Sequence, residues 1–292
     1  MKTEPRIGLI GGTGLDQALL ESGRGRRVQV RTPFGPPAAA PILADWRGIP
    51  VAILARHGIG HVYNPSQVPY RANIFALKIL GCRWILASGA VGSFKPSIAP
   101  GQLVLADQAI DRTVLRERTF FDDAAVHVDF AQPMCEKLRG LVYASRGAVN
   151  GAVKVHPAGT YLCMEGPAFS TRAESRLYRS WGADVIGMTM LPEAKLAREA
   201  QISYAFVALV TDYDSWKPHR RGVAGAALLQ EIGANLRSAA GNGLALIRAA
   251  LPRIWAAREE FFPAHRALEL ALWSDRKKIS AVTKARLAQL CG

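Results

Sequence analysis

One apolar run of strand length, followed directly by two carboxylates, constrains the fold of this chain more than any other feature. The run covers residues 204–210 and breaks into Thr211-Asp212-Tyr213-Asp214-Ser215-Trp216. It predicts a strand buried on both faces, as in the centre of an α/β sheet. In extended chain, residues i and i+2 point to one face, so Asp212 and Asp214 could address one small ligand beyond the strand's carboxyl end. The alternative interpretation is a simple turn, because aspartate often bonds its own backbone there.

Length and composition predict one globular protein. The chain has 292 residues, 49% of them hydrophobic, which is enough to bury a sizeable core. No apolar stretch is long enough to span a bilayer, and no signal peptide precedes residues 7–10, so we expect a cytoplasmic protein without a membrane partner. The scattered cysteines, Cys82, Cys135, Cys163 and Cys291, predict free thiols and neither disulfides nor a zinc site.

The order of the expected elements predicts an α/β fold. Strands are expected at residues 7–10, 28–30, 51–54, 84–87, 102–110, 153–164 and 184–188, in addition to the run at 204–210. Helices are expected at residues 70–80, 133–145, 172–181, 192–200 and 223–250, the last stopped by Pro252. We therefore predict a single domain with a central mixed β-sheet flanked by helices, at residues 1–252. Residues 253–292 are expected to form a basic, partly helical and solvated appendage.

Two glycine-bearing turns and an Arg-His pair, each placed after an expected strand, predict an anion site. The turns are Gly11-Gly12-Thr13-Gly14 and residues 88–93, and the pair is Arg56-His57. Backbone N–H groups in such turns and the arginine fork both suit phosphate. A dinucleotide site fits less well, since Gln17 stands where the third glycine of that fingerprint belongs.

A metal site is not expected. His57 and His61 are four residues apart, but Gly58 and Gly60 make a helix that would pair them improbable.

Seven motifs in order resemble the trimeric purine nucleoside phosphorylase / methylthioadenosine phosphorylase family. They are G-G-T-G-L-D at 11–16, T-P-F-G at 32–35, A-R-H-G at 55–58, Y-R-A-N-I-F-A-L-K at 70–78, M-E-G-P-A-F-S-T-R-A-E-S at 164–175, W-G-A-D-V-I-G-M-T at 181–189 and T-D-Y-D-S-W at 211–216. They extend over roughly residues 7–250. The resemblance implies a purine nucleoside phosphorylase-like fold and an enzyme, a pentosyltransferase in which phosphate attacks the anomeric carbon of a purine nucleoside and the base leaves.

The resemblance also implies roles for individual residues. Asp212, the catalytic residue, and Asp214 would contact N7 and the 6-amino edge of the purine, and the carboxylate at 212 indicates the methylthioadenosine branch. The 6-oxopurine branch typically has asparagine there. The other implied substrate contacts are Phe169, Ser170, Met188 and, from a neighbouring subunit of a homotrimer, His127. The implied phosphate contacts are Gly11, Thr13, Arg56, His57, Gly89, Ala90 and Thr189.

The implied reaction is the phosphorolysis of S-methyl-5'-thioadenosine to adenine and 5-methylthioribose 1-phosphate, a step of purine and methionine salvage. Inorganic phosphate is the co-substrate, and no cofactor is needed. A purine leaves poorly as an anion, so an acid that is protonated near neutral pH has to protonate N7. The alternative within the class is a 6-oxopurine nucleoside or methylthioinosine phosphorylase.

A nucleic-acid-binding protein is the alternative of another class. The formal charge of +14 suggests it. However, lysine and arginine are dispersed and no recognition motif is found, so no nucleic-acid partner is expected.

Two departures from the family concern the ligand pockets. Gly89 stands where the family usually offers phosphate a hydroxyl group, so only backbone contact is available there. Gly225 replaces a bulkier apolar residue in the segment for the 5'-substituent, which also contains Arg220, Arg221, Leu228 and Leu229. The preference for a methylthio group is therefore less constrained than the preference for adenine.

Overall fold

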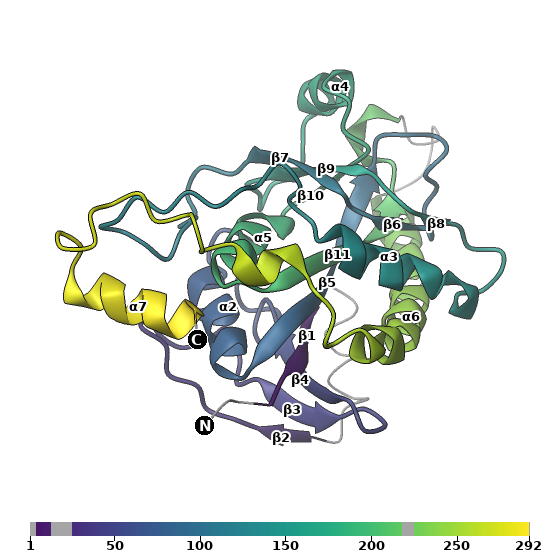
Figure 1. Cartoon of the computed structure of the whole chain (residues 1–292). Helices are drawn as coiled ribbons and strands as arrows, with labels where there is room; N and C mark the ends of the chain where they lie inside the picture. Colours follow the sequence, from purple (N-terminus) through teal and green to yellow (C-terminus); the bar gives the residue numbers. More distant parts are fainter. Residues whose placement is uncertain (1–3, 13–24, 218–224, 292) are drawn as a thin grey trace.

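The computed structural model describes residues 4–12, 25–217 and 225–291. Within these residues the strands form one 11-stranded sheet with parallel and antiparallel pairs, which confirms the predicted fold class (Figure 1). The strands are β1 (Arg6–Gly11), β2 (Gly25–Arg27), β3 (Ile42–Asp45), β4 (Pro50–Ala55), β5 (Cys82–Ser93), β6 (Leu103–Leu105), β7 (Gln108–Arg112), β8 (Val155–His156), β9 (Thr160–Met164), β10 (Val185–Gly187) and β11 (Ser203–Asp212).

The long strand β5 connects the parts of the sheet. It pairs in parallel with β1 on one side and with β11 on the other, and β1 pairs in parallel with β4. The end of β5 also pairs with β10 in antiparallel fashion, and the sheet continues from there through β9 to β7. The carboxyl ends of β1, β4, β5 and β11 therefore meet at one edge of the sheet, where open α/β sheets bind ligands.

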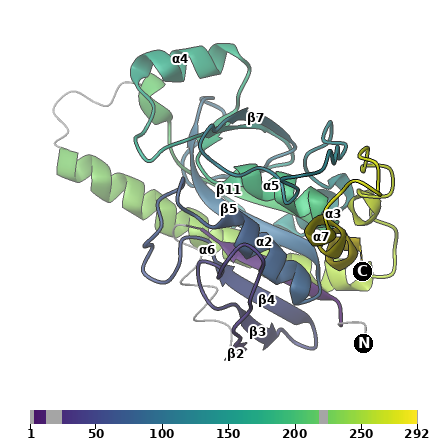
Figure 2. The ribbon, with the colours of Figure 1, turned by 90° about the vertical axis from the view of Figure 1, so that its left-hand side faces the viewer.

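Helices cover both faces of the sheet (Figures 1 and 2). They are α2 (Tyr70–Ile79), α3 (Glu136–Ala144), α4 (Arg172–Ser180), α5 (Met190–Glu199), α6 (Gly225–Ala256) and α7 (Ala281–Cys291), with 3-10 turns η1 (Arg146–Ala148), η2 (Asp214–Trp216) and η3 (Pro263–Arg266). One core joins α2 and α5 to the sheet, and a second core on the opposite face joins α3 and α6 to it. Successive residues of β11 alternate between these cores, Phe206 entering the first and Val207 the second. The expected burial of this strand on both faces is thus confirmed.

Several element boundaries differ from the sequence-based expectation. Residues 88–93, expected as a turn, continue β5, because β11 and β10 supply hydrogen-bond partners along them. The expected strand at 28–30 lies instead at 25–27, where it pairs with the unpredicted β3. Two ranges that were each expected as one strand contain two. Residues 102–110 contain β6 and the start of β7, and residues 153–164 contain β8 and β9.

Helix α6 also differs, since it passes through Pro252 and ends at Ala256. Proline removes one backbone donor, but Leu251 and Ile254 on either side are fully buried against the sheet. This packing keeps the last turn helical.

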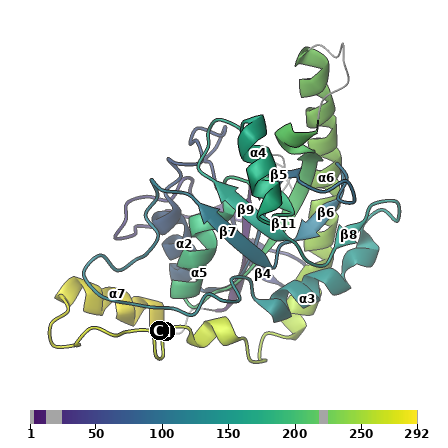
Figure 3. The same ribbon diagram turned by 90° about the horizontal axis from the view of Figure 1, so that it is seen from above.

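The C-terminal appendage packs against the rest of the chain through a few buried residues and leaves most of α7 exposed. It runs from η3 to α7, which lies across the molecule from the first turns of α6 (Figure 3). In α7, Leu290 and Thr283 are fully buried, and the backbone carbonyl of Leu290 accepts a hydrogen bond of 3.1 Å from Gln201. None of the described helices combines the length and apolar character needed to cross a membrane.

Candidate active site

Four chain segments meet at the carboxyl edge of the sheet to form what we call the anion end. It comprises the backbone of Gly12 after β1, Arg56 after β4, Gly89 in β5 and Thr189 before α5. A Cβ atom added to Gly12 would lie 2.5 Å from Arg56 Nη1 and 2.6 Å from the Ser88 carbonyl, so only glycine fits there. A Cβ atom added to Gly89 would lie 3.3 Å from Thr189 Oγ1. The structure therefore brings together segments that are far apart in the sequence.

Arg56 is fully buried in the anion end and is held by Glu193. Its Nε donates to Oε2 over 2.7 Å, and its Nη2 donates to Oε1 over 2.9 Å. Burial by itself would lower the pKa of Arg56, but the Glu193 carboxylate outweighs it and raises that pKa above its usual range. Arg56 is therefore a permanent cation in a defined orientation.

His57 is held as a neutral imidazole. Its Nδ1 lies 2.8 Å from the carbonyl oxygen of Tyr63, so Nδ1 carries the proton and donates, which leaves Nε2 as an acceptor. Burial, together with the charge of Arg56, lowers the pKa of His57 to about 4. The ring stacks on His61 with centroids 4.1 Å apart. His57 thus contributes hydrogen bonding and no positive charge at neutral pH.

The two aspartates form the other end of the site, which we call the carboxylate end. Asp212 Oδ1 accepts the backbone N–H of Asp214 over 2.7 Å, and Asp212 Oδ2 accepts the Thr211 hydroxyl over 2.7 Å. The Asp214 carboxylate accepts the Ser170 hydroxyl at 2.7 and 2.8 Å and also accepts the Ser175 hydroxyl. Hydrogen bonds therefore fix both carboxylates, and those to Asp214 link the pair to α4.

The extended geometry expected for this pair is wrong. Asp212 ends β11, but Asp214 lies in η2 with φ of +49°. The bond from the Asp214 N–H to Asp212 is the turn contact considered as the alternative interpretation. The turn is therefore present, and it folds Asp214 back toward the end of the strand.

Strand β5 joins the anion end to the carboxylate end. A Cβ atom added to Gly92 would lie 3.0 Å from Asp212 Oδ1 and 3.0 Å from Asp214 Cβ. Gly89 and Gly92 are three residues apart, or about 10 Å along a strand. The separation of the two ends suits a nucleoside, with its base at one end and an anion at the other.

Met188 and Phe169 lie in the segments beside these ends. Met188 is half-buried and directly precedes Thr189, and its Sδ would lie 2.6 Å from a Cβ atom added to Gly166. Phe169 is 84% exposed, although its neighbour Ser170 is buried against Asp214. The structure therefore places Ser170 in the carboxylate end and leaves the ring of Phe169 at the surface.

His127 lies on a segment that pairs with the C-terminal appendage. Its backbone N–H donates to the carbonyl of Ala271 over 2.8 Å, and its ring meets the edge of Trp273 with centroids 5.1 Å apart. The side chain is exposed.

Some predicted residues lie outside the described parts of the chain. These are Thr13, Arg220 and Arg221, and at Gly225, Leu228 and Leu229 only the helical backbone is described. The predicted phosphate residues within the described chain all belong to the anion end or directly adjoin it, and they are Gly11, Arg56, His57, Gly89, Ala90 and Thr189. Among the described residues, no group of three or more His, Cys, Asp or Glu could hold a metal ion.

Sequence reasoning missed the buried polar residues that support the site. Arg116 lies in a stretch whose sequence shows no helix or strand periodicity, so no element was predicted there. Its Nη1 nevertheless donates to the carbonyls of Met188 over 2.5 Å and Leu191 over 2.7 Å. Its Nε donates to Glu165 over 2.9 Å, and hydrogen bonds lower the pKa of that carboxyl to about 2 although burial opposes them. No local pattern signals such a role. Glu193 did have a signal, a carboxylate in the first turn of an apolar helix.

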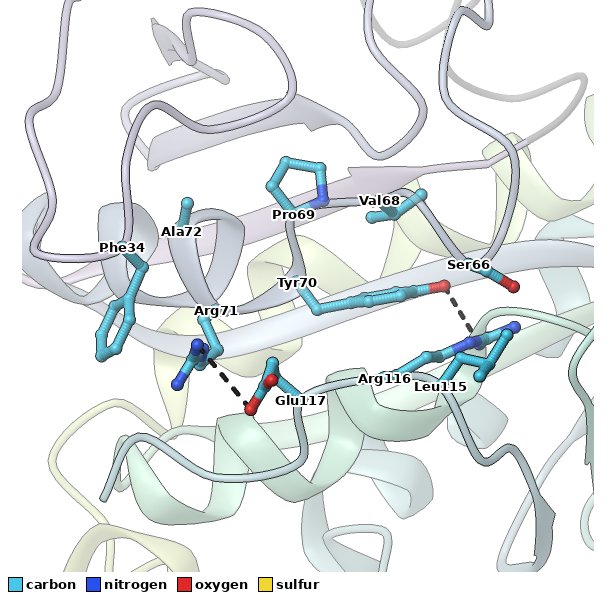
Figure 4. A pocket seen from close by; sticks show the side chains of 10 residues that line it. All are labelled: Phe34, Ser66, Val68, Pro69, Tyr70, Arg71, Ala72, Leu115, Arg116 and Glu117. Atoms are coloured by element: carbon cyan, nitrogen blue, oxygen red, sulfur yellow. Dashed lines mark hydrogen bonds and ion pairs between the residues drawn. The ribbon is translucent and has the colours of Figure 1, made fainter. Parts of the chain in front are cut away.

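A cavity of about 230 Å³ is lined in part by Arg116 (Figure 4). It is lined by Phe34, Ser66, Val68, Pro69, Tyr70, Arg71, Ala72, Leu115, Arg116 and Glu117. None of the predicted site residues lines it. Arg116 connects the two, since it lines the cavity and also donates to the carbonyl of Met188.

The chain is similar to several known proteins. The family model described as "Phosphorylase superfamily" matches residues 6–252. An S-methyl-5'-thioadenosine phosphorylase from Gloeobacter violaceus is 46% identical over 290 residues, which are 98% of this chain and 95% of that protein.

Solved structures are similar as well. A methylthioadenosine phosphorylase from an antarctic soil metagenomic library superposes with a TM-score of 0.88 at 44% identity, covering 99% of both chains. A Schistosoma mansoni methylthioadenosine phosphorylase in complex with adenine has a TM-score of 0.81 at 33% identity, covering 94% of this chain and 100% of that one.

Proposed function

Because this chain belongs to the phosphorylase superfamily, we propose that it catalyses the phosphorolysis of S-methyl-5'-thioadenosine. Phosphate bonds to the anomeric carbon, the glycosidic bond breaks, and adenine and 5-methylthioribose 1-phosphate are released. The observation that carries this function is the joint placement of the anion end and the carboxylate end along β5, with Gly92 beside Asp212.

The two ends divide the work of the reaction. At the anion end, Arg56 and the N–H groups near Gly12 and Gly89 hold phosphate below the sugar. Met188, next to Thr189, borders the ribose. At the carboxylate end, Asp212 delivers a proton to N7 as the bond to the base breaks, and the oxocarbenium-like sugar is captured by phosphate. Asp214, which is held by Ser170 and Ser175, supports the purine edge.

Adenine is the preferred base because its 6-amino group is a donor. Once it has given its proton to N7, the Asp212 carboxylate only accepts hydrogen bonds, whereas a 6-oxopurine presents another acceptor at that position. Pairing acceptor with acceptor leaves buried polar groups without partners, which an enzyme site penalises strongly. No observation in the described residues favours a 6-oxopurine nucleoside or methylthioinosine as the main substrate.

One assay tests this function. The protein is incubated with methylthioadenosine, adenosine or inosine, with and without phosphate, and the release of free base is followed. We expect phosphate-dependent release of adenine from methylthioadenosine and little release of hypoxanthine from inosine. Equal release without phosphate would identify a hydrolase, and faster release from inosine would identify the 6-oxopurine activity.

The proposal includes a homotrimer with shared sites, because His127 is exposed on a segment that pairs with the C-terminal appendage. The reaction uses phosphate as co-substrate and no cofactor, and neither nucleic acid nor membrane is part of it. A cytoplasmic location is proposed from the free cysteines, of which Cys82, Cys135 and Cys163 are buried.

A further inference from the structure

We propose that Glu193 is a positioning residue for phosphate. It fixes the guanidinium of Arg56 in the orientation that presents its remaining N–H groups to the anion. This inference rests on the proposed function, because it assigns a new residue to the phosphate-binding half of the same site.

The contact between Glu193 and Arg56 defines both the position and the plane of the guanidinium. The two bonds, Nε to Oε2 at 2.7 Å and Nη2 to Oε1 at 2.9 Å, form a side-on fork. Arg56 is 0% and Glu193 1% exposed, so water does not compete for either group. A bidentate fork of this kind prevents rotation that a single bond would allow.

A third contact leaves a defined part of the guanidinium for a ligand. Nη1 donates to the Ser88 carbonyl over 2.7 Å. An arginine has five N–H groups, and within the described chain these bonds use three of them. One N–H remains on each terminal nitrogen. The missing side chain of Gly12, which would lie 2.5 Å from Nη1, lets the glycine turn adjoin the same nitrogen.

Glu193 is itself fixed by the fold. The Tyr204 hydroxyl in β11 donates to Glu193 Oε1 over 2.7 Å. Glu193 also lies in the first turn of α5, directly after Thr189, whose hydroxyl faces Gly89. The start of one helix therefore places both a phosphate contact and the carboxylate that orients the arginine.

A positioning role and a purely electrostatic role of Glu193 predict opposite effects on phosphate binding. Glu193 cancels the charge of Arg56, so a carboxylate that mattered only through its charge would weaken phosphate binding, and its removal would strengthen it. A positioning carboxylate has the opposite effect, because its removal releases the guanidinium from the productive orientation. The direction of the change in phosphate KM therefore distinguishes the two roles.

The test compares Glu193→Gln with a matched variant of another carboxylate that pairs with arginine. Glutamine keeps the size of glutamate but cannot accept both N–H groups of Arg56. We expect Glu193→Gln to raise the phosphate KM about tenfold or more, with the nucleoside KM changed much less. Glu165→Gln, which alters the pair with Arg116 behind Met188, should instead raise the nucleoside KM. An unchanged or lower phosphate KM in folded Glu193→Gln overturns the proposal.

Two further variants keep the test decisive if Glu193→Gln folds poorly. Tyr204→Phe removes one bond to the same carboxylate and should raise the phosphate KM by a smaller factor, and no change would contradict the proposal. In an Arg56→Gln background, adding Glu193→Gln should not raise the phosphate KM further, because the residue acts through Arg56. A wild-type protein without phosphate-dependent activity would refute the proposed function, which is a separate outcome.

Discussion

We propose that Asp212 carries the choice between purine classes. In this proposal, asparagine at 212 would remove the acid for N7 and supply an amide that can donate to a 6-oxo group. We expect Asp212→Asn to lose most activity on methylthioadenosine and to shift the ratio of inosine to methylthioadenosine turnover by about 100-fold or more. Measuring kcat/KM for both nucleosides in wild type and variant checks this.

Asp214→Asn is the control for this substitution. It should weaken use of adenine nucleosides with a smaller change of preference, since Asp214 is already engaged by Ser170 and Ser175. If Asp212→Asn leaves the preference unchanged, Asp212 serves only the turn.

Glu199 should make the stability depend on pH. Its carboxylate is 5% exposed and accepts the backbone N–H of Phe120 over 2.8 Å. Burial raises its pKa from the model-compound value of 4.5 to about 7, although bonds from Phe120 and Thr119 oppose the shift. The folded state therefore binds more protons than the unfolded state between these values. As a result, the free energy of unfolding falls as pH rises through this window, by about 3 kcal/mol in all.

Denaturant unfolding at pH 5 and pH 8 measures this effect. Glu199→Gln keeps an acceptor for the Phe120 N–H without a charge, so this contribution to the fall should disappear. Glu174→Gln, at an exposed carboxylate whose pKa is lowered by Thr171, should keep the fall seen in wild type. An equal fall in the Glu199→Gln variant would show that other groups cause it.

Helix α4 connects local helix chemistry to the carboxylate end. It begins with a capping box, in which Thr171 Oγ1 accepts the Glu174 N–H at 3.2 Å and the Glu174 carboxylate accepts the Thr171 N–H at 2.7 Å. The same helix carries Ser175, which donates to Asp214. Thr171→Ala should destabilise the protein by about 1 kcal/mol and raise the nucleoside KM more than the phosphate KM.

Thermal unfolding and steady-state kinetics test this link, and Thr171→Ser is the control because it retains the capping hydroxyl. If alanine and serine variants have the same nucleoside KM, the start of α4 does not position Ser175.

The assembled molecule is proposed to share its sites between subunits. If His127 completes the site of a neighbour, homotrimers of His127→Ala and of Asp212→Asn should both be impaired. A hybrid of the two contains sites with both native residues, and we expect mixing with subunit exchange to restore part of the activity on methylthioadenosine. Light scattering should give the mass of a trimer. Full activity of a monomer would contradict shared sites. The same holds if native mass spectrometry shows that subunits have exchanged but activity is not recovered.

The C-terminal appendage supports the segment that bears His127 through packing contacts. Residues around Ala271 and Trp273 pair with the segment that bears His127, and Arg286 of α7 donates to the carbonyl of Phe120 over 3.0 Å. The basic residues beyond Pro252 thus belong partly to packing contacts, which composition alone could not indicate.

The local sequence pattern was sufficient to predict the central strand of the sheet and the presence of the main helices. Phe206 and its neighbours in β11 had to be buried on both faces because no polar residue interrupts them. Thr171 and Gly182 bracket α4 for reasons of capping that act within a few residues. The order of short motifs was likewise enough to indicate the family.

What the sequence by itself determined, then, is burial, helix ends and which residue types are available for chemistry, since these depend on neighbours in the chain. The tertiary structure alone decided the pairing of Arg56 with Glu193, 137 residues away, and the anchoring of Met188 by Arg116. It also turned residues 88–93 from an apparent loop into strand and folded Asp214 back in η2. Buried polar groups take whichever partner the assembled fold brings within reach, and no local spacing encodes that partner.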